Sequence, residues 1–436
     1  MSQVLTRSSD YNSKAMYKRA MGGSLDDLNS LTKIDSGDPQ YNSQIGRVLD
    51  ILLYRMNRSI QSPTTPIELF SLSTAYCCCL MNLQPSEDEI PDSLSKGFTR
   101  MWPAIWKIFG STLVPSVTRH TLNAEGCRFA NSLVVGVCRV LGLDNITMLQ
   151  MITTPGFSSV VLEIWSMEVE HPDYQPRHDE DGSSMSAFLD RVLIFINNQD
   201  KDMLERFLAP TNGDMKSLAS TALKHHHHSF YQTRPDWDCV IWNTHIITVL
   251  SGIHDPLRHA FLAQHSISAI TKLLATLAAE TPLSATASLK GKVISYSLWN
   301  LIQSIDTTDG VTWVIQALEA KLMLALIRCE RWLPFFHDDP EDFFYPFLKK
   351  VLPNYSAYRS VLCIIDKYMG KIQQLGLDAG KSQDTPLWKV WNCFVELVES
   401  RIELLRLTPG GLLRAHERCQ NAAVSLINFR SLESTI

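Results

Sequence analysis

Residues 155–168 read "PGFSSVVLEIWSME", and this stretch decides the fold class of the chain. Its apolar residues fall at i, i+3, i+4, i+7 and i+8, at Phe157, Val160, Val161, Ile164 and Trp165. An α-helix gathers residues with this spacing on one side, so the stretch predicts a helix that buries a single apolar stripe.

The start of this helix is marked in the sequence as well. Thr154 is a residue type that caps a first helical turn, and Pro155 suits the first helical position, where its missing N–H is not needed. We therefore expect the helix to begin at this Thr-Pro pair.

A second stripe lies near the C-terminal end, with steps of 3, 4, 3, 4 and 3 residues, at Trp388, Trp391, Val395, Val398, Ile402 and Leu405. A stripe this narrow suits packing against a neighbouring antiparallel helix.

Helical periodicity recurs along nearly the whole chain, and no run of alternating apolar and polar residues is long enough to indicate a sheet. Short breaks rich in Gly, Pro, Asp and Ser separate the further helical segments, which we place near 44–60, 66–82, 94–110, 116–142, 145–153, 184–198, 214–229, 237–251, 257–276, 286–304, 310–333, 355–374 and 411–428. No strict repeat period is visible. The sequence therefore predicts an all-α fold, an irregular α-solenoid or armadillo-like helical array.

The domain organisation follows from two polar stretches, the first residues and "EHPDYQPRHDEDGSSM" at 170–185. We expect a disordered tail at 1–15, an N-terminal helical lobe at 16–170 and a polar loop at 171–183. A C-terminal helical lobe would then cover 184–408, and a terminal helix 409–436.

Composition argues against two classes of partner. The net charge is −5, and no cluster of Lys and Arg reaches five residues, so we expect no nucleic-acid binding. No apolar run approaches the ~18 residues that a bilayer span needs, so we expect no membrane partner.

Cysteine usage bears on the compartment. The chain has 10 cysteines, mostly inside apolar stretches, and no Cys-x-x-Cys pair, which predicts packed thiols and neither a disulfide framework nor a zinc knuckle. The first residues lack the apolar core of a signal peptide. Both features indicate the cytoplasm or the nucleus.

Four consecutive histidines, His225 to His228, are the strongest candidate in the sequence for a metal site. Neighbours on a helix point about 100° apart, so only His225 and His228 would share a face. His245 could return on an antiparallel helix and complete a zinc site, but the run also closes a helix, where histidines interact well with the dipole. We favour the structural interpretation.

The stretch "FFHDDPEDFFY" at 335–345 gathers His337, Asp338, Asp339, Glu341 and Asp342. A divalent-cation site is imaginable, yet acids that cap the next helix explain the cluster more simply. Because no nucleotide-binding, hydrolase or metalloprotease motif occurs either, we assign no catalytic, cofactor-binding or metal-binding residue.

Tryptophans mark further helix stripes. Trp102, Ile105, Trp106 and Phe109 share one helical face, which is typical of core anchors. Some of these aromatic residues could instead be contact points for a partner.

Several segments together resemble a known family: "AMGGSLDDLNSL" (20–31), "SKGFTRMWPAIWKIF" (95–109), "LDNITMLQMITTPGFSSVVLEIWSMEVE" (143–170) and "HDPLRHAFLAQHSISAITKLLATL" (254–277). They are similar to the large helical region of fungal MYND-type zinc-finger proteins, and the resemblance covers roughly 20–420. In that family a Trp-x-x-Ile-Trp-Lys helix precedes a Thr-Pro-Gly turn and a Trp-bearing helix, as here.

The family's zinc finger is not carried over. It often opens Cys-x-Asn-x-x-Cys, and here Cys419 and Asn421 match, but Val424 stands at the second ligand position. We expect either a relative without a finger or a gene-model or splice variation that replaced it.

Three functional hypotheses remain. The first is a non-enzymatic helical scaffold or adaptor, without a cofactor, that binds a protein partner of unknown identity. The second is a metal-binding protein that uses His225–His228 or the acidic loop and loses its metal when His225 and His228 become Ala. The third is a transcriptional adaptor, which the resemblance alone implies.

Overall fold

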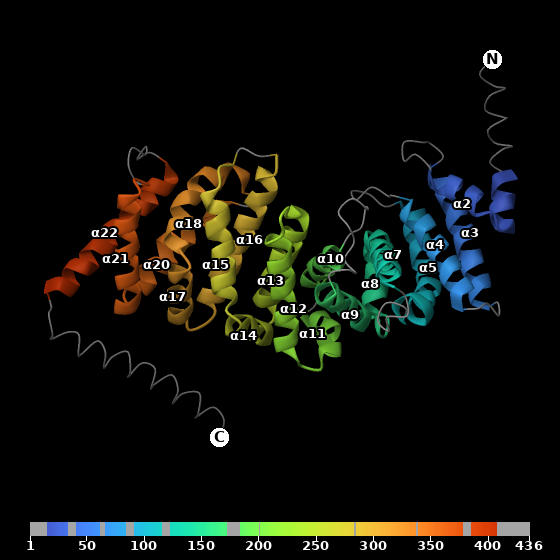
Figure 1. Cartoon of the computed structure of the whole chain (residues 1–436), viewed down its shortest axis with the longest axis horizontal. Coiled ribbons are helices and arrows are strands. Elements are labelled where there is room, and N and C mark those ends of the chain that lie inside the picture. Colours follow the sequence, from blue (N-terminus) through green and yellow to red (C-terminus); the bar gives the residue numbers. More distant parts are fainter. Residues whose placement is uncertain are drawn as a thin grey trace, which may run out of the picture. The chain divides into compact units, whose positions relative to one another are not determined.

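The computed structural model describes residues 15–33, 41–61, 66–83, 91–115, 123–171, 184–199, 201–282, 285–336, 339–377 and 385–407. Within these residues every regular element is a helix and no strand occurs (Figure 1). The expected all-α helical array is therefore confirmed.

The chain divides into two compact units, Met1–Phe261 and Leu262–Ile436. The sequence places the division at 171–183 instead, a stretch of which all but residue 171 lies outside the described residues. The helices on either side of it, α9 (Phe157–Glu170) and α10 (Met185–Asn197), pack on each other within the first unit. A polar stretch in the sequence thus marks a connection within a unit and not a boundary between units.

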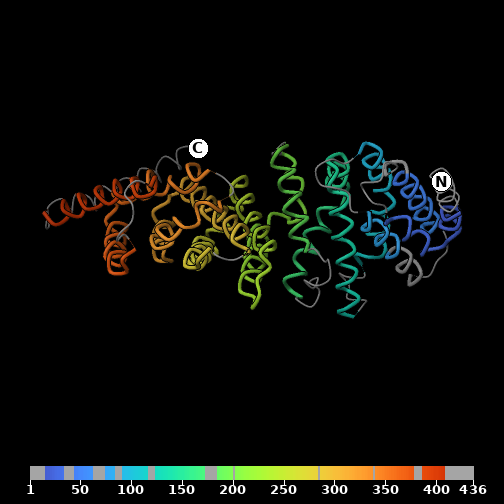
Figure 2. The backbone as a smooth tube through the Cα atoms, turned by 90° about the horizontal axis from the view of Figure 1, so that it is seen from above, coloured from blue at the N-terminus to red at the C-terminus, as the bar shows by residue number. Residues whose placement is uncertain are grey.

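The first unit is built from helices that pack on near neighbours in the chain. In this unit α3 packs on α5, α4 on α7, and α13 on both α10 and α12 (Figures 1 and 2). Its other elements are α2 (Leu25–Thr32), α3 (Tyr41–Gln61), α4 (Pro66–Met81), α5 (Asp92–Ile108), the π-helical turn η1 (Phe109–Leu113), α7 (Ala124–Gly142), α8 (Asn145–Thr153), α11 (Lys201–Leu208), the 3₁₀ turn η3 (Ala209–Thr211), α12 (Met215–Phe230), α13 (Trp237–Ile253) and most of α14 (Asp255–Ala263).

In the second unit, α15 packs on α16, α17 and α18, while α21 packs on α17, α18 and α22. Its elements are α15 (Ser266–Ala279), α16 (Ala287–Asp306), α17 (Val311–Glu319), α18 (Leu322–Arg328), the 3₁₀ stretch η4 (Cys329–Phe335), α19 (Pro340–Phe343), the π-helical turn η5 (Phe347–Val351), α20 (Leu352–Tyr355), α21 (Arg359–Gln374) and α22 (Pro386–Leu407).

Two segments expected as single helices are each broken. The segment at 257–276 contains most of α14 and most of α15, with His265 between them at φ 60°. The segment at 310–333 contains α17, α18 and part of η4, with Lys321 at φ 78° before α18. A left-handed residue reverses the chain in a tight turn, and because neither residue is glycine, the sequence gives no signal for the break.

The expected cap of α9 is wrong. Gly156, at φ 81°, precedes the first helical residue Phe157, whose N–H donates to the carbonyl of Thr154 at 3.1 Å. Thr154, Pro155 and Gly156 therefore form a tight turn with glycine at the left-handed position. The Thr154 hydroxyl instead donates to the Gln150 carbonyl at 2.7 Å and accepts the Trp102 indole N–H at 2.8 Å.

The predicted stripes are largely buried. Phe157, Val161, Ile164 and Trp165 lie in the core of the first unit, and Val160 is half-buried. Trp102, Ile105 and Phe109 are also buried, and Trp106 is half-buried. In α22, Trp388, Trp391 and Val398 are buried, whereas Val395, Ile402 and Leu405 are half-buried.

The cysteines within the described part of the chain are all free, and most of them are buried. Burial raises the pKa of the Cys77, Cys138 and Cys329 thiols, so these side chains pack as small neutral groups. Among the helices that are described, none has both the length and the apolar character needed to cross a membrane.

Replacing a buried tryptophan should destabilise the unit that contains it. Trp165 is 0% exposed and Trp391 is 3% exposed, so we expect Trp165→Ala and Trp391→Ala each to lower the free energy of unfolding by about 3–5 kcal/mol. Trp299→Ala is the control, because Trp299 is 37% exposed, and it should lower the free energy of unfolding by less than either core change does. Urea unfolding followed by circular dichroism measures all three, and unchanged midpoints for both core variants would contradict the buried stripes.

Candidate functional site

The histidine run is split between two environments by the helix that contains it. His225 and His226 are buried, His227 is exposed and His228 is partly exposed. The buried pair continues the core-facing stripe of α12, which consists of Leu218, Ala219, Ala222, His225, His226, Ser229 and Phe230. The apolar stripe that begins at Leu218 and Ala222 reaches both histidines when it is continued in helical steps, so it predicts that they are buried. The spacing of the histidines alone does not predict this.

His225 joins α12 to α9. Its ring stacks on the Trp165 ring, with centroids 4.8 Å apart and planes 6° apart. Its Nε2 lies 2.7 Å from the Trp165 carbonyl oxygen, which can only accept, so Nε2–H donates. Burial lowers the pKa of His225 to about 3, and burial likewise lowers the pKa of His226 to about 4. Both imidazoles are therefore neutral parts of the core at pH 7.

Neighbouring helices hold this contact in place. The Trp165 indole N–H donates to the Ser186 hydroxyl of α10 at 3.0 Å. The Asn243 amide of α13 donates to the Ser229 hydroxyl of α12 at 3.3 Å. The buried contact between α9 and α12 is thus supported from two further helices.

His245, which the sequence left as a possible further ligand, does not join the histidine run. His245 Nδ1 lies 2.6 Å from Asp190 Oδ1, so it pairs with α10. Burial raises the pKa of Asp190, while the contact with His245 opposes that shift. Across the described ranges, no three His, Cys, Asp or Glu side chains lie close enough together to hold a metal ion.

The described part of the acidic segment at 335–345 contains the start of a helix, α19. Asp339 accepts the Glu341 N–H at 2.9 Å and so caps α19, and Glu341 pairs with Lys349 at 2.5 Å. His337 and Asp338 lie outside the described residues. The capping interpretation is confirmed for Asp339.

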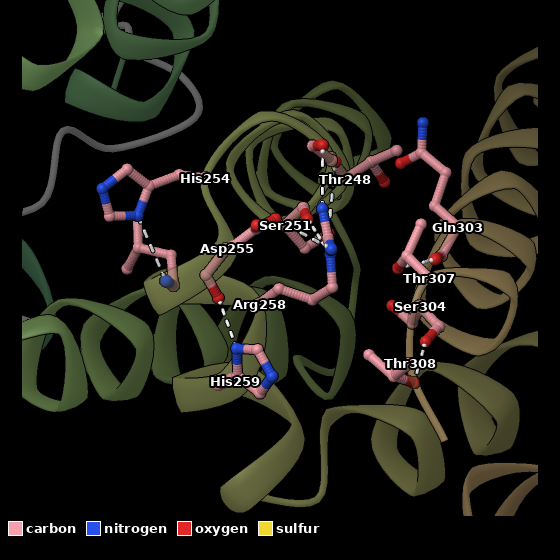
Figure 3. Close-up of polar contacts among 12 residues, drawn as sticks. Thr248, Ser251, His254, Asp255, Arg258, His259, Gln303, Ser304, Thr307 and Thr308 are labelled. Atoms are coloured by element: carbon pink, nitrogen blue, oxygen red, sulfur yellow. Dashed lines mark hydrogen bonds and ion pairs between the residues drawn. The ribbon is translucent and has the colours of Figure 1, made fainter. Parts of the chain in front are cut away.

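A second group of buried polar side chains surrounds the start of α14 (Figure 3). The Arg258 guanidinium donates to the carbonyls of Ser251 at 2.7 Å and Gly252 at 3.1 Å. His254 Nδ1 accepts the Leu257 N–H at 3.1 Å and so caps the helix. These bonds join the end of α13 to α14, which makes the group structural.

Glu168 is buried and carries a strongly shifted pKa. Burial raises its pKa to about 7, although the Met185 N–H and the Asn131 amide both donate to the carboxylate. The Met185 N–H lies 2.9 and 3.1 Å from the two carboxylate oxygens. Glu168 therefore fixes the first residue of α10 against α9 and has no access to solvent.

The surface of α12 opposite its buried stripe is a better candidate for function. Ser217, Thr221, Lys224, His228 and Tyr231 follow one another in steps of 4, 3, 4 and 3 residues, so they share one face. Every one of these side chains is exposed or half-exposed. A hollow lies at each end of this face, which we call the α12 face.

The hollow at the N-terminal end of α12 is acidic, and we call it the acidic hollow. Its volume is about 300 Å³, and it lies between α9, η3 and α12, with Trp165 among its lining residues. The carboxylates of Glu163 and Asp214 and five Ser or Thr hydroxyls line it, with no Lys or Arg. These carboxylates and hydroxyls can all accept hydrogen bonds, so the hollow suits a cationic group.

The hollow at the C-terminal end is wider and contains no acid, and we call it the basic hollow. Its volume is about 650 Å³, and it is lined by His227, His228, Tyr231, Gln232, Thr233 and Arg234. The His227 and Tyr231 rings contact each other, with centroids 4.5 Å apart, and Tyr231 remains 58% exposed. Arg234 takes part in no ion pair with the described side chains, so its guanidinium is available to an anion.

No protein-family model matches the chain, and neither a comparison with curated proteins nor one with solved structures finds a match. The function of this chain is therefore argued from the geometry of the α12 face and its two hollows.

The buried His225 should make unfolding dependent on pH. Its pKa falls from 6.5 in the unfolded chain to about 3 in the folded chain, so between these values the unfolded chain binds the extra proton. Its contribution to stability is complete above pH 6.5 and is lost as the pH falls. Relative to His225→Gln, which keeps an N–H donor but does not titrate, the wild type should lose about 2 kcal/mol between pH 7 and pH 5.

Urea unfolding at a series of pH values measures this difference. His225→Phe serves as the control, because it keeps an aromatic ring against Trp165 but has no N–H for the Trp165 carbonyl. It should show the same weaker pH dependence as His225→Gln at a lower overall stability. A wild type whose stability relative to both variants stays constant from pH 7 to pH 5 would rule out the buried neutral imidazole.

Proposed function

We propose that the chain is a non-enzymatic helical scaffold that binds a protein partner on the α12 face. One observation carries the proposal: a single exposed helix face ends in two open hollows whose charged side chains have opposite sign. Recessed polar surfaces of this kind accept protruding side chains of a partner, and helical arrays present such surfaces widely.

The residue types on the α12 face support this function. Tyrosine and arginine are among the residues that contribute most binding energy at protein interfaces, and here Tyr231 and Arg234 line the same hollow. Tyr231 is also more exposed than Tyr54, the exposed tyrosine of α3, at 58% against 47%. An aromatic ring supported by His227 offers contact area at a small entropic cost.

The helix that carries the face is held in place before a partner arrives. His225 stacks on Trp165, and Trp165 also lines the acidic hollow. Since little ordering is then needed on binding, more of the contact energy appears as affinity.

We further propose that this scaffold works in the cytoplasm or the nucleus. The free, mostly buried cysteines among the described residues support a reducing compartment. We also propose that these helical segments are related to the helical region of fungal MYND-type zinc-finger proteins. The proposed relationship does not extend to the zinc finger.

Removing the tyrosine should weaken partner binding without unfolding the protein. We expect Tyr231→Ala to reduce partner recovery at least about fivefold, since truncating a central aromatic contact costs more than about 1 kcal/mol. Proximity labelling in the native cell, with quantitative mass spectrometry of the labelled proteins, measures recovery for the wild type and each variant.

Tyr54→Ala is the matched control, because it removes an exposed tyrosine from another helix of the same unit. It should leave the labelled proteins unchanged. Circular dichroism melting curves of both variants should overlay that of the wild type. Equal labelling by Tyr231→Ala and Tyr54→Ala would exclude the α12 face as the binding surface.

A further inference from the structure

The two halves of the α12 face carry opposite charge. Glu163 and Asp214 lie at the acidic hollow, while Lys224, midway along the face, and Arg234, in the basic hollow, carry positive charge. None of the ion pairs formed among the described side chains includes any of these four residues. Their charges are therefore available to a bound molecule.

Other nearby charges do not cancel this arrangement. The dipole of α12 places about half a positive charge at its N-terminus and half a negative charge at its C-terminus, against two carboxylates at the first end and the Arg234 guanidinium at the second. Asp214 also accepts the Ser217 N–H at 2.9 Å, which offsets part of the positive end. Asp236 and Asp238 follow Arg234 in the chain, but Asp236 accepts the N–H of Asp238 at 3.0 Å and caps α13.

The distance between the hollows sets the length of a ligand that reaches both. Ser217 lines the acidic hollow and His228 the basic hollow, and His228 follows Ser217 by eleven positions along the helix. At 1.5 Å per residue this is about 17 Å. An extended peptide rises about 3.3 Å per residue, so side chains about five residues apart span the same distance.

We propose that the α12 face binds an extended peptide segment of a protein partner that carries a Lys or Arg and, about five residues away, an Asp or Glu. This inference rests on the proposed scaffold function and names the chemistry of its partner. The cationic side chain enters the acidic hollow, where carboxylates and hydroxyls accept its N–H groups. The acidic side chain meets the Arg234 guanidinium, which can donate two parallel hydrogen bonds to a carboxylate.

The test uses the full chain and two labelled peptides, Lys-Ser-Gly-Ser-Gly-Glu and the same residues in reverse order. Fluorescence anisotropy at low salt measures the binding of each. We expect the tighter-binding order, called the preferred peptide, to bind more tightly than a peptide in which Ser replaces both charged residues. Binding of the preferred peptide should weaken as salt rises to 0.15 M, where exposed charges are screened over about 8 Å.

Matched charge reversals make the test specific. Arg234→Glu should weaken the preferred peptide about tenfold, and a peptide whose Glu is replaced by Lys should regain binding to this variant only. Glu163→Lys should likewise weaken binding of the preferred peptide. A peptide whose Lys is replaced by Glu should regain binding to this variant only. Arg58→Glu, which reverses an exposed arginine of α3, is the control and should leave binding unchanged.

Each outcome separates this inference from the function on which it rests. Peptides that bind equally with and without their charged residues, or reversals that show no rescue, would overturn the inference. If Tyr231→Ala still lowered partner recovery in that case, the scaffold function would stand with a partner of other chemistry. If Tyr231→Ala and Arg234→Glu both left recovery unchanged, the scaffold function at this face would fail as well.

Discussion

The α12 face depends on one buried contact, between His225 and Trp165. The two rings stack, and the imidazole donates to the Trp165 backbone carbonyl at 2.7 Å, so the contact fixes both the position and the rotation of α12 on α9. Rotation matters most, because a turn of about 100° would exchange His225 for a neighbouring histidine and point Ser217 and Tyr231 elsewhere. Both hollows would then lose the side chains that line them.

A neutral imidazole suits this position better than an aliphatic side chain. It offers a flat ring that stacks on Trp165 and an N–H that donates to the buried Trp165 carbonyl. The requirement is that the ring stays uncharged, and burial provides this by lowering the pKa of His225 to about 3. The same run supplies His227 and His228 to the basic hollow, so four identical residues serve two roles that helix geometry alone assigns.

The sequence predicts what depends on local spacing. The stripes at 157–165 and 388–398 are largely buried, as expected, because apolar periodicity reports directly on burial in a helix. It does not predict the breaks at His265 and Lys321, since a left-handed residue other than glycine leaves no pattern in the sequence. The hollows cannot be predicted from the sequence either. The acidic hollow is formed by residues near 160, 210 and 220, and only the packing of α9, η3 and α12 brings these residues together.

Opposite charges at the two ends of one helix face have a consequence for specificity. A uniformly charged surface accepts any oppositely charged segment in either direction. On the α12 face, a segment laid in reverse would bring its acid to Glu163 and Asp214 and its base to Arg234, and both contacts would be repulsive. Such like-charge contacts oppose the wrong alignment as well as the wrong sequence. A peptide bound in the proposed way is therefore aligned in one direction, even though each exposed ion pair by itself contributes only about 1 kcal/mol or less.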